Sequence, residues 1–109
     1  MTPRRLWISS PFLELELIPK PAYFRNEREV AFYGKYFQDI VWRSVEDVQA
    51  VSKPARQEAE KSGLGAMDAL HLAAASLGEA DEFITLEKRG SPIYRTSLVR
   101  IVYLSPAAA

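Results

Sequence analysis

The chain has 109 residues, with 14 basic and 14 acidic side chains that cancel to a net charge of zero. Its hydrophobic fraction of 48% is enough for one core, which excludes a disordered chain. The lack of cysteine excludes disulfides, thiolate catalysis and cysteine-based zinc sites. No stretch approaches the roughly 20 apolar residues of a membrane span, and the basic start is not followed by a signal-peptide core. We therefore expect a single cytoplasmic domain over residues 1–109, without membrane association and without a general basic coat for nucleic acid.

The chain opens with the pattern of a strand followed by a helix. Leu6–Ser9 is a short apolar run, typical of a buried strand. Ser10 is a suitable N-cap, and Pro11 suits the first position of a helix. We expect this helix to end at Pro19–Pro21, because proline cannot continue the hydrogen-bond ladder.

The middle of the chain is predicted to contain two longer helices with a strand between them. The first covers Asn26–Asp39, and its apolar stripe consists of Val30, Tyr33, Phe37 and Ile40. Ile40–Trp42 is the candidate strand. The second helix covers Glu46–Lys61 with an apolar face of Val48, Val51, Ala55 and Ala59, and Pro54 predicts a kink or two short helices.

The last third continues the alternation of helices and strands. Gly63 and Gly65 predict a break, after which an alanine-rich helix over Met67–Leu77 ends at Gly78 as its cap. Phe83–Thr85 and Leu98–Leu104 are the remaining predicted strands. This alternation indicates an α/β fold with a mainly parallel sheet, in which ligands bind beyond the carboxyl ends of the strands.

Three acidic residues lie close to such strand ends or helix starts. Glu16 follows the first strand, Asp68 opens the alanine-rich helix, and Glu87 lies two residues beyond Thr85. Clustered carboxylates repel one another, so they need a cation or protonation to coexist. A site built from oxygen ligands alone suits Mg²⁺ or Mn²⁺, which can activate water for attack on a phosphodiester. The plain alternative is that Asp68 stabilises its helix and the two glutamates are solvated.

Three segments in the same order resemble motifs of the PIN-domain family, the metal-dependent ribonucleases of bacterial toxin–antitoxin systems. They are ISSPFLELE at residues 8–16, GLGAMDALHLAAA at residues 63–75 and EADEFITLEK at residues 79–88. The second is the most specific of them. The resemblance implies a PIN-like three-layer α/β/α fold with a mainly parallel sheet. It also implies hydrolysis of RNA with Mg²⁺ (or Mn²⁺), and an antitoxin-like protein partner.

The resemblance assigns roles to individual residues. Asp68 matches a metal ligand, and Glu16 matches the second acid, with Glu14 as its competitor because the two point to different helix faces. Glu87 stands where the family commonly has Asp, and Thr85 matches a small hydroxyl residue that lines the site. The implied catalytic and metal-binding set is therefore Glu16, Asp68 and Glu87.

One part of the family pattern has no counterpart in this chain. A complete PIN domain opens with the central strand of its sheet, which ends in a catalytic Asp, whereas no Asp precedes Asp39 here. We therefore expect a domain that lacks the first, central strand and is incomplete at the N-terminus or naturally degenerate, with weak or no nuclease activity alone. The alternative function is a non-catalytic interaction module that binds an antitoxin-like helix or forms a homodimer.

Several conspicuous residues have simpler interpretations. We expect His71 to pack within the helices, since the family mechanism needs no histidine, and Trp7 and Trp42 to belong to the core. A local basic edge is predicted after Glu87, where no further acid occurs. Its members are Lys88, Arg89, Arg95 and Arg100.

Overall fold

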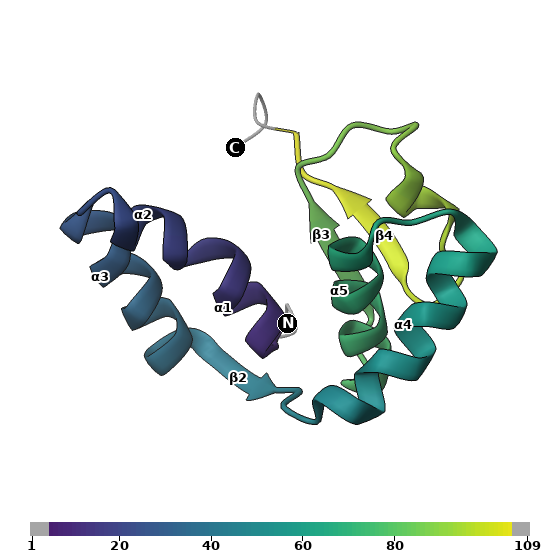
Figure 1. The fold of residues 1–109 in the computed structure, drawn as a ribbon, viewed down its shortest axis with the longest axis horizontal. Helices are drawn as coiled ribbons and strands as arrows, with labels where there is room; N and C mark the ends of the chain where they lie inside the picture. The colour runs from purple at the N-terminus through teal and green to yellow at the C-terminus, as the bar shows by residue number, and fades with distance from the viewer. Residues whose placement is uncertain (1–4, 106–109) are drawn as a thin grey trace, which may run out of the picture. The chain divides into compact units, whose positions relative to one another are not determined.

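The computed structural model describes residues 5–105. The chain divides into two compact units, Met1–Glu46 and Asp47–Ala109. Each unit combines helices with one pair of parallel strands, and Figure 1 shows the pair of the second unit. Over the described range, no helix combines the length and apolar character needed to cross a membrane.

The first unit contains a pair of short strands joined by a helical segment. Its elements are β1 (Trp7–Ser9), α1 (Pro11–Leu17), α2 (Pro19–Tyr23), α3 (Glu27–Lys35), the π-helical turn η1 (Tyr36–Ile40) and β2 (Val41–Ser44). β1 and β2 pair in parallel, with a register shift between Trp7 and Ile8. The shift places Trp7 opposite Val41 but Ile8 opposite Arg43.

Local sequence chemistry sets most helix boundaries in this unit. Ser10 caps α1 as predicted, because its Oγ accepts a hydrogen bond from the Leu13 amide at 3.4 Å. α1 also ends before Pro19, but this proline then begins α2, which was not predicted; the fixed φ of proline suits a first helical turn. Asn26 caps α3 through two hydrogen bonds with Glu29. The predicted Asn26–Asp39 helix is therefore present, but its last residues form the wider turn η1.

The second unit contains two longer helices and the second strand pair. Its elements are α4 (Val48–Ser62), α5 (Ala66–Leu77), β3 (Glu82–Thr85), the 3₁₀ turn η2 (Pro92–Arg95) and β4 (Arg100–Tyr103). β3 and β4 pair in parallel, from Glu82 opposite Arg100 to Thr85 opposite Tyr103. The prediction of an α/β fold with parallel strands is thus confirmed. The three-layer arrangement and its missing central strand stay predictions.

The ends of α4 follow from a polar cap and a glycine. The Asp47 Oδ1 accepts a hydrogen bond from the Ala50 amide at 3.1 Å, which begins the helix. At the other end Gly63 adopts φ = 67°, a left-handed conformation that favours glycine. Pro54 lies inside one uninterrupted helix, so of the two predicted outcomes the pair of short helices is excluded and the kink stays a prediction. The preceding cap and the packing of the following turns outweigh the one hydrogen bond that proline cannot donate.

The core of the second unit forms where α4 packs against α5. Small side chains on both helices allow close approach of the two backbones. The buried hydrophobic residues are Val51, Ala55, Leu64, Ala69, Leu72, Ala73, Ala74 and Ile93. The buried face of α4 differs from the predicted one, since Val48 is exposed whereas Glu58 and Ser62 are buried. Ser62 Oγ donates to Glu58 Oε1 at 2.7 Å, which partners this buried carboxylate.

The first unit lacks such a core within its described residues, where no large hydrophobic side chain is fully buried. Trp7 is 37% exposed and Trp42 is 53% exposed, so the prediction that both indoles belong to a core was wrong. Hydrophobicity alone suggested burial, but short helices and a two-stranded pair enclose too little space for a side chain of this size.

Candidate functional site

Asp68 is the third residue of α5 and lies in its first turn, and Gly65 is the N-cap of this helix. The Asp68 side chain is half-buried. Gly65 has no side chain that could cap the helix, and Asp68 is the acidic residue of the first turn, where the helix amides favour negative charge. Over residues 5–105, no ion pair or side-chain hydrogen bond of the protein engages the Asp68 carboxylate. Asp68 therefore stabilises the start of α5 through its charge, and its carboxylate oxygens have no hydrogen-bond or ion-pair partner among the described residues.

Glu87 is held just beyond the carboxyl end of β3 by two hydrogen bonds to its backbone. The Thr85 Oγ1 accepts from the Glu87 amide at 3.1 Å, which closes a tight turn after the strand. Tyr94 Oη donates to the Glu87 carbonyl at 2.7 Å. The side chain of Glu87 is exposed. Thr85 thus positions the backbone of Glu87, and Tyr94 is a second positioning residue that sequence reasoning missed.

Asp68 and Glu87 lie at the same end of the second unit. The His71 ring lies 6.5 Å from the Phe83 ring, centroid to centroid, so α5 packs alongside β3. The turn between the two elements is short, so the end of α5 and the start of β3 are neighbours, and the two elements run in opposite directions (Figure 1). The start of α5 and the end of β3 therefore lie at the same end of the second unit. The same ring contact supports the prediction that His71 packs within the fold.

Glu16 belongs to α1 in the first unit, as does its competitor Glu14. Both side chains are exposed. Residues two positions apart on an α-helix point about 200° apart, so only one of these carboxylates can face a given site. Within either unit, the described residues contain no group of three histidine, aspartate or glutamate side chains arranged to hold a metal ion. The joint site of Glu16, Asp68 and Glu87 consequently stays a prediction.

Two members of the predicted basic edge are engaged inside the second unit. Arg95 Nη1 donates to the Ser62 carbonyl at 3.3 Å and so caps the carboxyl end of α4. Arg100 Nη1 lies 3.4 Å from Glu82 Oε2 across the strand pair. Lys88 and Arg89 remain, both exposed in the turn after Glu87. The predicted basic edge of four residues is therefore reduced to Lys88 and Arg89.

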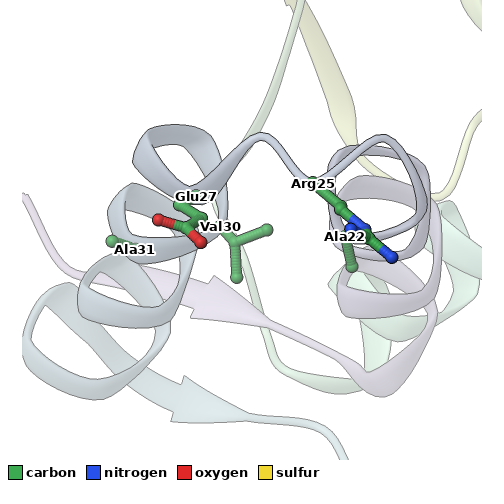
Figure 2. Close-up of a pocket in the computed structure, with 5 residues that line it drawn as sticks. All are labelled: Ala22, Arg25, Glu27, Val30 and Ala31. Atoms are coloured by element: carbon green, nitrogen blue, oxygen red, sulfur yellow. The ribbon is translucent and has the colours of Figure 1, made fainter.

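A shallow pocket of about 390 Å³ opens between α2 and α3 in the first unit (Figure 2). Ala22 and Arg25 line it from α2 and the following turn, and Glu27, Val30 and Ala31 line it from α3. Its surface is mainly apolar, with one basic and one acidic side chain at its walls. Such a surface suits contact with another protein better than enclosure of a small molecule.

Neither protein-family models, nor curated proteins, nor solved structures give a match to this chain. The resemblance to the PIN-domain family therefore rests on the three sequence motifs.

Proposed function

We propose that the chain is a PIN-like metal-dependent ribonuclease domain that hydrolyses phosphodiester bonds of RNA. The observation that supports this proposal is that the start of α5, which contains Asp68, and the turn after β3, which contains Glu87, lie at the same end of the second unit. Ligands of α/β proteins bind beyond the carboxyl ends of the strands. The Thr85–Glu87 turn adds support, because it fixes the backbone of a candidate ligand.

The donor set suits a hard divalent cation. Asp68 and Glu87 supply carboxylate oxygens, and Glu16 would supply a third, so Mg²⁺ or Mn²⁺ is the fitting ion. When bound, such an ion lowers the pKa of a coordinated water and offsets negative charge on a phosphodiester. The protein's own contribution is to hold the carboxylates in place through the start of α5 and the Thr85–Glu87 turn.

Activity of this chain alone is expected to be weak or absent. The resemblance implies a fourth acid, an aspartate at the end of a central strand, for which the sequence before Asp39 has no candidate. With fewer carboxylates, the cation is held less tightly and the water less well oriented. Metal binding is therefore a sharper test of the proposal than RNA cleavage. The cytoplasm is the compartment in which such an RNA substrate would be met.

Paramagnetic broadening by Mn²⁺ tests the proposal on the intact chain. Amide signals at the start of α5, in the Thr85–Glu87 turn and near Glu16 in α1 should broaden first during a titration. Asp68→Asn should abolish this selective broadening, because it removes a ligand charge and keeps the side-chain shape. Asp81→Asn is the matched control, since Asp81 is exposed in the turn before β3 and should leave the pattern unchanged. Uniform broadening, or a pattern that Asp68→Asn leaves intact, would refute the site.

The second candidate function is a non-catalytic interaction module that binds an antitoxin-like helix. The pocket between α2 and α3 favours it, because three aromatic side chains of these helices and the turn between them are exposed rather than packed. They are Tyr23, Phe24 and Phe32. Exposed aromatic side chains beside an apolar groove are typical of helix-binding surfaces. The Mn²⁺ titration separates the two functions, since an interaction module need not bind the ion selectively.

A further inference from the structure

We draw no further inference here: the strongest candidate, the apolar pocket between α2 and α3, belongs to the second candidate function already described, and nothing among the described residues shows what covers it.

Discussion

Replacement of Leu72 by alanine should be among the most destabilising single changes in the second unit. Leu72 is 0% exposed and lies where α5 packs against α4. Removal of its buried methyl and methine carbons forfeits about 2 kcal/mol of transfer free energy, at about 0.8 kcal/mol for each carbon. The cavity adds about 1–2 kcal/mol, because a well-packed core relaxes only partly around it. We expect a total loss of about 3–4 kcal/mol in the free energy of unfolding.

Urea unfolding followed by far-ultraviolet circular dichroism measures this loss. The melting temperature should also fall by at least about 12 °C, since 1 kcal/mol corresponds to about 4–8 °C in a domain of this size. Leu77→Ala is the matched control in the same helix, because Leu77 is 45% exposed and should cost less than about 1 kcal/mol. If both substitutions cost the same, Leu72 does not occupy the core, and the packing of α5 on α4 is wrong.

Three further predictions concern the candidate site, a helix end and pH. Glu16→Gln should weaken selective Mn²⁺ binding whereas Glu14→Gln should not, as measured by the Mn²⁺ titration; the opposite result would make Glu14 the ligand. Gly63→Ala should cost about 1 kcal/mol or more in urea unfolding, because φ is 67° and an added Cβ would lie 3.1 Å from Arg95 Nη1. Gly65→Ala has open space and negative φ, so a similar cost there would contradict the strain argument. Burial raises the pKa of the Tyr36 hydroxyl above its ordinary value of 10.0, so the folded chain keeps this proton longer than the unfolded chain. Stability should therefore fall as the pH rises above about 10, and an equal fall in Tyr36→Phe would exclude Tyr36 as a cause.

The elements with strong local signals were predictable from sequence. Ser10 caps α1 and Gly63 ends α4, because each boundary depends on one residue's own hydrogen-bonding or backbone preference. Gly78 is the C-cap of α5 as predicted, but its φ is −78° and the left-handed residue at this helix end is Glu79, with φ = 60°. The residues of α2 lacked such a signal, since Pro19 is equally compatible with the end of one helix and with the first turn of the next. The exposure of Trp42 was not predictable either, because it depends on how much surface the neighbouring elements can offer.

The candidate site was predictable to different degrees. The Thr85–Glu87 turn depends on two neighbouring residues and follows from local chemistry. The placement of Asp68 at the same end of the second unit follows from the alternation of helix and strand. The contact of Tyr94 with the Glu87 carbonyl was not predictable, because it depends on the path of a loop without periodicity. Whether Glu14 or Glu16 faces the site depends on the rotation of α1 about its own axis. The periodicity of the sequence does not determine this rotation.

The segment between β3 and β4 contains two parts with different accessibility to proteases. Its second part is anchored, because Ile93 is buried and Arg95 donates to the end of α4. Its first part is a turn around Lys88 and Arg89, where both side chains are exposed and Gly90 has φ = 101°. Trypsin should therefore cleave after Lys88 or Arg89 well before it cleaves after Arg95. The nicked chain should stay in one piece through the β3–β4 pair, which makes this turn a suitable place to insert an affinity tag or a fluorescent label.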